Sequence, residues 1–375
     1  MLREVEWGEY RLGDLFEVCT YKKRFDANKV SVLGNGEYPY IVRMSSDNGQ
    51  KGFINEDKDF LNDGNTLSFG QDTATIFYQE RPYFTGDKIK VLKCKYPHFG
   101  KQNAQFFVAA ISRAFHHYSW GTSSYSVEMI EGQKVSLPVK NGEIDFHFME
   151  KFVAELEAKR ITELEAYLLA TGLTDYFLTV EEEKSLQELN THKMSLFRIG
   201  NLFERVKVNK LPYKANDLPK TPTEENILPC LTSSFHNQGL NYYIPVKGTT
   251  VLKNVISIPS NSDVYRAYFQ SRDFTVLSDA YAIRWKYTEA PLSSKQYLFF
   301  VQCINKVTDL PTFSYKNKLG GWNVVKDLYI ALPIKDREID LPFMDLLISA
   351  LQKLIIKDVV LYVEAKVNAT KNGCQ

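Results

Sequence analysis

The sequence predicts an α+β protein made of two similar strand-rich domains in tandem, each followed by one long helix. Three observations support this prediction. Short motifs occur twice along the chain in the same order, runs of β-favouring residues fill most of each half, and a long helical pattern closes each half. Such a layout is typical of a duplicated α+β unit.

The repeat covers most of the chain. Residues 118–138 (YSWGTSSYSVEMIEGQKVSLP) and 313–333 (FSYKNKLGGWNVVKDLYIALP) both open aromatic-Ser-aromatic and end on Leu-Pro. A period of roughly 190 residues is too long for a solenoid and indicates duplication of a whole domain. The other matching pairs are YRLGDLFE (10–17) with FRIGNLFE (197–204), TGDKIKV (85–91) with LSDAYAI (277–283), QFFVAAI (105–111) with LFFVQCI (298–304), and LPVKNGEIDFHFM (137–149) with LPIKDREIDLPFM (332–344).

The body of each half reads as strands. Runs such as NTLSFG (65–70), KIKVLK (88–93), VISIPS (255–260) and AYAIRW (280–285) concentrate β-favouring residues between Gly, Asn, Asp and Pro. We therefore expect one domain over residues 1–143 and its copy over residues 195–338. The charged segment between the halves, within residues 173–194, is expected to be a linker or a short surface helix.

A long helix is expected over residues 144–172 and another over residues 339–368. Asp145 and Asp340 are suitable N-caps, and Gly172 is a suitable end for the first helix. About 25 residues at 1.5 Å each give a length of roughly 37 Å. An apolar stripe is unstable alone in water, so we expect the two helices to pair as an antiparallel coiled coil; the alternative is that each packs on its own domain. The stripe residues are Phe148, Phe152, Leu156, Leu164, Leu168, Phe343, Leu347, Leu351, Leu354 and Tyr362.

Composition indicates an ordinary soluble protein of the cytoplasm. The 375 residues are 44% hydrophobic and 24% charged, with a net charge of +1 and no apolar run long enough for a membrane span. The charged N-terminal residues differ from a signal peptide. The five cysteines lack CxxC spacing, which argues against a disulfide framework or a cysteine-bound metal. A nucleic-acid binder is often far more basic, so any basic surface has to be local or come from a partner.

Four motifs carry a resemblance to a known family. WGEYRLGDLFEV (7–18) and MSLFRIGNLFERV (194–206) open the halves, and SLPVKNGEIDFHFMEKF (136–152) and ALPIKDREIDLPFMDLL (331–347) enter the long helices. With the duplicated layout, they make the chain similar to the specificity (S) subunits of type I restriction–modification systems, including the related type IIB S subunits.

This resemblance implies a division of labour. Each domain would be a target recognition domain for one half of a bipartite, asymmetric double-stranded DNA target. The paired helices would set the gap between the half-sites, where one turn of DNA is about 34–36 Å, and would dock methyltransferase or fused endonuclease–methyltransferase subunits. The chain itself would be non-catalytic and bind no cofactor, while the partners would bind S-adenosylmethionine and Mg.

Polar loops of both halves supply candidate DNA-binding residues, because Arg, Lys, Asn, Gln, Ser and Thr side chains read base edges or hold phosphates. Taken singly, each residue fits an ordinary solvated loop better than a DNA contact; taken as a group, and given the resemblance, some of these loops are expected to touch DNA. The loops differ between the halves while the framework matches, which favours an asymmetric target. The candidates are Arg43, Ser45, Asn48, Lys51, Gln71, Thr73, Thr122 and Ser123 in the first half, and Ser233, His236, Asn237, Asn261, Tyr265, Arg266, Lys316 and Lys318 in the second.

Other possible sites are weaker. His116 and His117 lack a third ligand at useful spacing, and we interpret Asp72, Glu80 and the acidic run at residues 181–183 as solvated charges. The sequence contains no GxGxxG, GxxxxGK[ST] or [DN]PP[YF] motif. Two alternative functions stay open: a tandem protein-interaction adaptor, and a nuclease with an unrecognised site.

Overall fold

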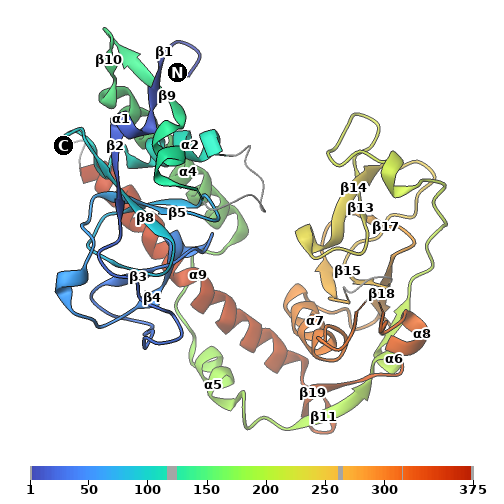
Figure 1. Cartoon of the computed structure of the whole chain (residues 1–375). Coiled ribbons are helices and arrows are strands. Elements are labelled where there is room, and N and C mark those ends of the chain that lie inside the picture. Colours follow the sequence, from blue (N-terminus) through green and yellow to red (C-terminus); the bar gives the residue numbers. More distant parts are fainter. Residues whose placement is uncertain (1, 116–124, 261–264, 315, 373–375) are drawn as a thin grey trace. The chain divides into compact units, whose positions relative to one another are not determined.

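The computed structural model describes residues 2–115, 125–260, 265–314 and 316–372. The chain divides into two compact units, residues 1–166 and residues 167–375, which we call unit 1 and unit 2. Each unit contains its own sheets and core (Figure 1). The helix α4 (Phe146–Thr171) crosses the boundary between them.

Unit 1 contains three small sheets with strand orders β1-β9-β10, β2-β8-β5-β6 and β4-β3-β7. The pairs are antiparallel except β3 with β7, which are parallel. Its elements are β1 (Glu6–Arg11), α1 (Leu12–Leu15), β2 (Phe16–Thr20), β3 (Pro39–Ile41), η1 (Asp47–Gly49), β4 (Gln50–Phe53), η2 (Lys58–Phe60), β5 (Thr66–Gly70), β6 (Ile76–Gln79), β7 (Phe84–Thr85), β8 (Ile89–Cys94), α2 (Ala104–Phe115), α3 (Val127–Gly132), β9 (Lys134–Lys140) and β10 (Glu143–Ile144).

Unit 2 repeats this topology with the strand orders β11-β19-β20, β12-β18-β15-β16 and β14-β13-β17. The parallel pair recurs as β13 with β17. Its elements are α5 (Val180–Glu188), β11 (Met194–Arg198), α6 (Ile199–Leu202), β12 (Phe203–Arg205), η3 (Ala215–Asp217), β13 (Leu228–Leu231), η4 (His236–Gly239), β14 (Leu240–Ile244), β15 (Val255–Pro259), β16 (Tyr268–Gln270), β17 (Thr275–Val276), β18 (Ala280–Trp285), α7 (Ser294–Thr308), α8 (Trp322–Val325), β19 (Tyr329–Lys335), β20 (Glu338–Ile339) and α9 (Leu341–Asn372).

Even the irregularities of the sheets are shared. The register of β3 and β4 shifts between Tyr40 and Ile41, and the register of β13 and β14 shifts between Cys230 and Leu231. Because a bulge redirects the strand that follows it, the polar loops after these two strands start in the same way. The duplicated α+β architecture expected from the sequence is therefore present in both units.

The two cores are also built alike. α2 packs against β6 and β9, and α7 packs against β16 and β19. In unit 1 the Phe16 ring meets Phe107 edge to face, with 5.8 Å between ring centroids; in unit 2 Phe203 meets Phe300 at 5.3 Å. All four rings are fully buried, and burial of each contributes about 1.5–3 kcal/mol. The repeated LFE and FFV motifs thus supply the centre of each core.

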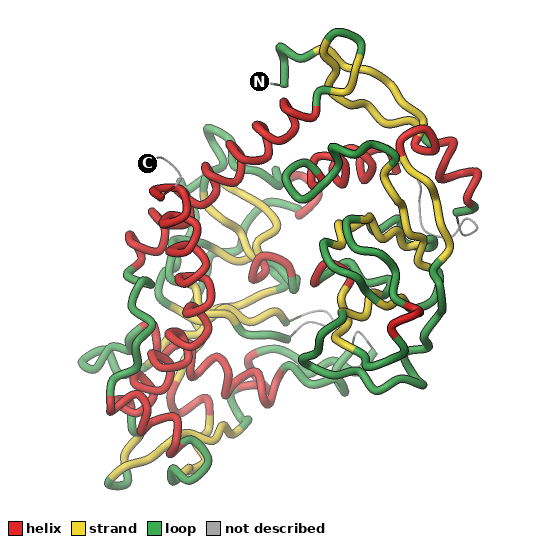
Figure 2. Tube along the Cα trace, turned by 90° about the vertical axis from the view of Figure 1, so that its left-hand side faces the viewer, coloured by secondary structure: helices red, strands yellow, loops and turns green. Residues whose placement is uncertain are grey.

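The two long helices begin as the sequence predicts. Oδ1 of Asp145 accepts a hydrogen bond from the amide of Phe148 at 2.9 Å, and Oδ1 of Asp340 accepts one from Phe343 at 3.0 Å. Gly172 lies just after α4 with φ +67°, and the Leu173 amide bonds back to the Leu168 carbonyl at 2.9 Å, as in a Schellman end. Figure 2 shows both helices as red coils.

Part of the segment expected as a linker is the helix α5, which packs on α9. Thr179 and Glu182 form a capping box at its start. Glu182 is 5% exposed, and its carboxylate accepts a hydrogen bond from Nζ of Lys353 at 3.0 Å. Interpreting the acidic run 181–183 as solvated was therefore wrong for Glu182, because α9 covers it.

Other sequence expectations concern thiols and membranes. The four described cysteines, Cys19, Cys94, Cys230 and Cys303, are free thiols. None of the described helices combines the length and the apolar composition needed to span a bilayer.

Candidate nucleic-acid interface

One polar loop has the same backbone geometry in both units. We call residues 42–49 (VRMSSDNG) loop 1 and residues 232–239 (TSSFHNQG) loop 2. The amide of Val42 donates to the carbonyl of Gly49 at 2.8 Å, and the amide of Thr232 donates to the carbonyl of Gly239 at 2.9 Å. Each loop therefore closes on itself at its base. In both, four consecutive residues before the final, buried glycine are exposed.

Each loop ends in three successive residues with positive φ. The angles are 50°, 55° and 74° for Asp47, Asn48 and Gly49. They are 46°, 54° and 91° for Asn237, Gln238 and Gly239. A non-glycine residue held in this region costs about 1–3 kcal/mol and persists where the surroundings over-determine it, commonly at functional sites.

The final glycine is required for space as well as for φ. A Cβ on Gly239 would lie 3.0 Å from the carbonyl oxygen of Thr232, and one on Gly49 would lie 3.2 Å from the Phe77 ring. Both loops thus share a constrained backbone that presents different side chains, with Ser45 and Asn48 exposed on loop 1 and His236 and Asn237 on loop 2.

A cleft of about 760 Å³ opens beside loop 1, and its lining includes the charged side chains Arg24, Arg43, Asp72 and Asp87. The guanidinium of Arg43 pairs with Asp72 and lies 3.8 Å from Asp87. Nζ of Lys88 lies 3.0 Å from the same Asp72 carboxylate. Asp72 is therefore not the solvated charge that the sequence indicated, because it holds two basic side chains at the mouth of the cleft.

A buried tyrosine supports the floor of this cleft. The Tyr40 hydroxyl donates to the carbonyl of Phe25 at 2.6 Å. Burial raises the pKa of Tyr40 to about 12, so the phenol stays protonated and keeps this bond near neutral pH. Glu80, also expected to be solvated, pairs with Lys101 at 3.0 Å on the surface.

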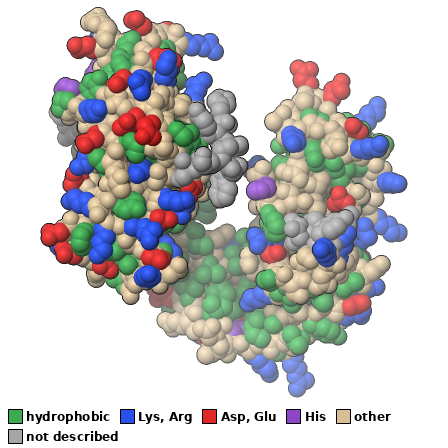
Figure 3. Space-filling model, in the orientation of Figure 1, with side chains coloured by type: hydrophobic (Ala, Val, Ile, Leu, Met, Phe, Trp, Pro, Cys, Tyr) green, Lys and Arg blue, Asp and Glu red, His purple; other side chains and the backbone are tan. Residues whose placement is uncertain are grey.

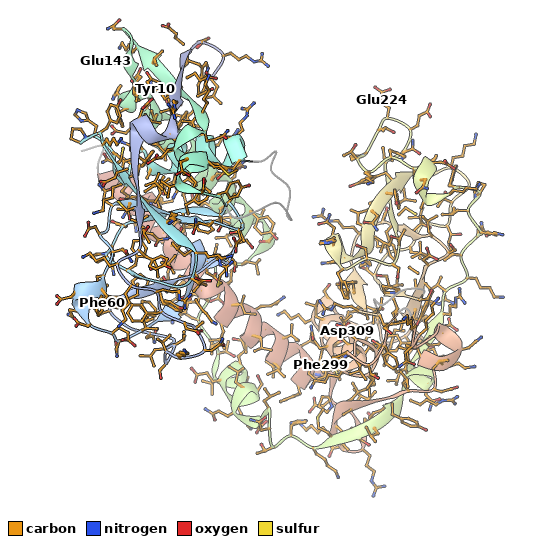
Figure 4. The ribbon with its side chains drawn as sticks, viewed as in Figure 1. Tyr10, Phe60, Glu143, Glu224, Phe299 and Asp309 are labelled. Atoms are coloured by element: carbon orange, nitrogen blue, oxygen red, sulfur yellow. The ribbon has the colours of Figure 1, made fainter. Side chains whose placement is uncertain are left out.

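Loop 2 is flanked by a different set of side chains. Nε of Arg266 donates to Oδ2 of Asp309 at 2.7 Å, and its guanidinium lies 5.3 Å from the centre of the Phe235 ring. Phe235 is 47% exposed at the tip of loop 2. Asp309 follows α7 and is labelled in Figure 4. The exposed ring of Phe235 and the guanidinium group of Arg266 together form a surface that can stack on a base and donate hydrogen bonds to it.

Other predicted DNA-binding residues make contacts inside their own unit. The side-chain amide of Gln71 donates to the Tyr125 carbonyl at 2.8 Å, and the Thr73 hydroxyl bonds to Thr75 at 2.9 Å. Tyr265 is only 1% exposed and belongs to the core of unit 2. Its expected role at the surface is therefore corrected, because the ring packs edge to face on Phe313 at 5.9 Å.

The remaining predicted positions lie on the surface or outside the described residues. Lys51 is exposed on β4, Ser233 is half-buried in loop 2, and Lys316 and Lys318 are exposed before α8. Thr122, Ser123 and Asn261, and with them His116 and His117, fall among residues that the structure does not describe. Figure 3 shows Lys and Arg interspersed with Asp and Glu on the visible face, which agrees with the near-neutral net charge.

The predicted helix stripe is only partly buried. Leu168, Phe343 and Leu347 are buried, whereas Phe148, Phe152, Leu164 and Leu351 are half-buried. Leu156, Leu354 and Tyr362 are 46%, 46% and 49% exposed. These three side chains leave apolar surface exposed on the long helices, so their place in a helix pair or a partner interface stays a prediction.

Four residues in or beside the loops are not among the DNA-binding residues predicted from the sequence: Phe235, Tyr268, Gln79 and Gln270. The sequence does contain a sign of the two glutamines, since an aromatic residue followed by Gln ends a β-favouring run in each half (YQ at 78–79, FQ at 269–270). Within the described ranges no group of three His, Cys, Asp or Glu is placed to hold a metal ion.

Comparison with known proteins identifies the class. Residues 4–166 match the model of the type I restriction modification DNA specificity domain. Unit 2 has the same three sheets in the same strand order. The chain is thus a specificity subunit of a restriction–modification system.

Particular relatives agree with this class. The chain is 21% identical over 355 residues to the specificity subunit S.BcgI of a type II restriction enzyme of Heyndrickxia coagulans, covering 94% of this chain and 96% of the relative. The crystal structure of the type I restriction–modification S subunit from M. genitalium has the same fold, with a TM-score of 0.56 at 12% identity, covering 98% of this chain and 93% of that one.

Proposed function

We propose that this chain is non-catalytic and reads a bipartite, asymmetric target in double-stranded DNA, one half-site for each unit. The observation that carries the proposal is the pair of matched loops. Loop 1 and loop 2 share their closing hydrogen bond and their positive-φ ending but not their side chains. Two loops with the same backbone conformation but different side chains would suit two half-sites of different base sequence.

Each loop would enter the major groove, where the donor and acceptor pattern distinguishes all four base pairs. In unit 1 the basic groups would be Arg43 of loop 1 and Lys88, which share the Asp72 carboxylate, and in unit 2 Arg266, which faces Phe235 of loop 2. Contacts of this kind contribute about 1–3 kcal/mol of discrimination per base pair. The paired carboxylates would orient the guanidinium groups before DNA arrives.

The long helices would set the gap between half-sites by pairing with each other. Burial far along the helices supports this part of the proposal. Leu168 in the last turn of α4 is 2% exposed, and Val360 and Val363, well beyond the start of α9, are each 3% exposed. Buried apolar side chains at these positions are what pairing of the two helices would give.

The same helices would dock the catalytic subunits, a methyltransferase or a fused endonuclease–methyltransferase, which would bring S-adenosylmethionine and Mg. Apolar side chains exposed along α9 support this: Ile355 is 76% exposed, Leu361 40% and Tyr362 49%. An exposed apolar stripe on a long helix is typical of a partner interface.

Methylome sequencing of the source cell with and without this gene tests the proposal. We expect one bipartite adenine motif to disappear when the gene is removed. Exchanging residues 1–137 for the equivalent part of S.BcgI should change one half of that motif and leave the other. An unchanged methylome, or metal-dependent DNA cleavage by the purified chain alone, would overturn the proposal.

A further inference from the structure

A glutamine, buried in unit 1 and half-buried in unit 2, holds the end of each polar loop. In unit 1, Nε2 of Gln79 donates to the carbonyl of Asn48 at 3.1 Å and to Oγ of Ser68 at 3.0 Å. In unit 2, Nε2 of Gln270 donates to the carbonyl of Gln238 at 3.3 Å and to Oγ of Ser257 at 3.0 Å. The same three-membered arrangement therefore occurs twice in the chain.

The serine connects the glutamine to the sheet. Ser68 lies on β5 opposite Phe77 of β6, and its hydroxyl donates to the Phe77 carbonyl at 3.4 Å. Ser257 lies on β15 opposite Tyr268 of β16 and donates to the Tyr268 carbonyl at 3.5 Å. Both serines are almost fully buried, at 2% and 3% exposure. Each glutamine amide is thus oriented by a rigid strand pair rather than by solvent.

The carbonyl that each glutamine binds belongs to a strained residue. Asn48 and Gln238 are the second of the three positive-φ residues, directly before Gly49 and Gly239. A strained, exposed turn collapses to other backbone conformations unless a fixed partner holds it. A hydrogen bond from an amide oriented by the sheet supplies that partner. For the buried Gln79, leaving the amide unpaired would cost about 1–3 kcal/mol; for the half-buried Gln270 the cost is smaller because water can reach it.

Each loop has one additional tie of its own. In loop 1, Nδ2 of Asn48 donates to the Tyr78 carbonyl at 3.0 Å. In loop 2, the Tyr268 hydroxyl donates to the Phe235 carbonyl at 3.4 Å. These ties differ between the units, whereas the Ser–Gln–carbonyl arrangement is shared. The shared part is therefore the general support of the loop, and the unshared part belongs to each loop's own side chains.

We propose that Gln79 and Gln270 are positioning residues for DNA recognition, each holding the reading loop of its own unit in the conformation that contacts bases. The proposal rests on the proposed function for the role of the loops. The hydrogen bond from each glutamine to its loop does not depend on DNA, so its effect on the loop can be measured without DNA.

Amide hydrogen exchange measures how firmly each glutamine keeps its loop closed. The Val42 amide is bonded to Gly49 and the Thr232 amide to Gly239, so the two amides report on loop 1 and loop 2. In Gln79→Met, which keeps the side-chain length but removes both donors, exchange at Val42 should rise about fivefold to tenfold while Thr232 keeps its rate. Gln270→Met should do the reverse. Ser68→Ala, a smaller change, should loosen loop 1 to a lesser degree.

Methylome sequencing with the same variants in the complete complex measures the recognition role. Gln79→Met should relax base preference in one half of the motif, and Gln270→Met in the other half. If a single variant raised the exchange rates of both amides equally, or changed neither rate, the proposal that each glutamine holds its own loop would be overturned. Looser loops with unchanged base preference would overturn their role in recognition. If the wild type modifies no bipartite motif, the proposed function fails while the exchange result still decides the hold.

Discussion

Nε of Arg266 lies 2.7 Å from Oδ2 of Asp309, and the same guanidinium faces the ring of Phe235 on loop 2. The hydrogen bond to Asp309 holds the pKa of Arg266 above its ordinary value, so this side chain is always charged. Arg43 lies within loop 1 and is paired with Asp72. In both units an arginine guanidinium group in or next to the loop is therefore held by a carboxylate.

Replacing Arg266 by Ala should weaken binding at one half-site only, by about 1–3 kcal/mol, because a base or phosphate loses its charged donor. The measurement is a set of binding isotherms on duplexes with single changes in either half-site. Arg43→Ala is the matched control and should affect the opposite half-site. Equal losses at both half-sites, or no loss, would contradict modular recognition.

The Glu182–Lys353 pair should make stability depend on acid pH. Burial alone would raise the pKa of Glu182, but hydrogen bonds from the Thr179 amide, Ser349 and Lys353 outweigh it and hold that pKa below its ordinary value. A lowered folded-state pKa means that stabilisation is complete above the pKa of the unfolded chain and is lost as pH falls through the folded-state pKa. Urea unfolding at pH 7 and near pH 4 measures this change.

The Glu182→Gln variant is the control for that dependence. It keeps the shape of the side chain but not its charge, so the loss on acidification should shrink. At pH 7 the variant should be less stable than the wild type by about 1–2 kcal/mol, since a charge-assisted hydrogen bond becomes a neutral one. An unaltered pH profile would mean that other groups govern acid unfolding.

Inserting four residues after Lys159 of α4 tests the helices as a ruler. The residues around this point are exposed, and four residues lengthen a helix by about 6 Å. The preferred gap between half-sites should then change by about two base pairs, at 3.4 Å per step. The same insertion in the exposed segment 221–225 should leave the gap unchanged. A constant gap with the α4 insertion would reject the ruler.

Salt dependence separates DNA recognition from an adaptor that grips proteins. Binding to duplex DNA should weaken at least about tenfold between 50 mM and 200 mM salt, since phosphate contacts release counterions. Fluorescence anisotropy of a labelled duplex with the full complex measures this loss. Affinity for DNA that is absent, or insensitive to salt, would favour the adaptor.

Local sequence signals were enough to predict the caps and the framework. Asp145 and Asp340 cap their helices through amides only three residues away, so the interaction is contained in the motif itself. The duplicated LFE and FFV motifs likewise occupy equivalent places in the two cores. In contrast, Tyr265 belongs to a mainly polar stretch of sequence, and only its packing in the core of unit 2, with its ring against Phe313, shows that it is a core residue.

The sequence by itself determined that one domain was written twice, where its strands and long helices lie, and which polar segments differ between the copies. Periodicity and capping act within a few residues, so they can be read along the chain. The tertiary structure alone decided that Asp72 holds Arg43, that Lys353 covers Glu182, and that Gln79 and Gln270 hold the two loops. These contacts join residues distant in the chain, and only the folded backbone brings their side chains within hydrogen-bonding distance.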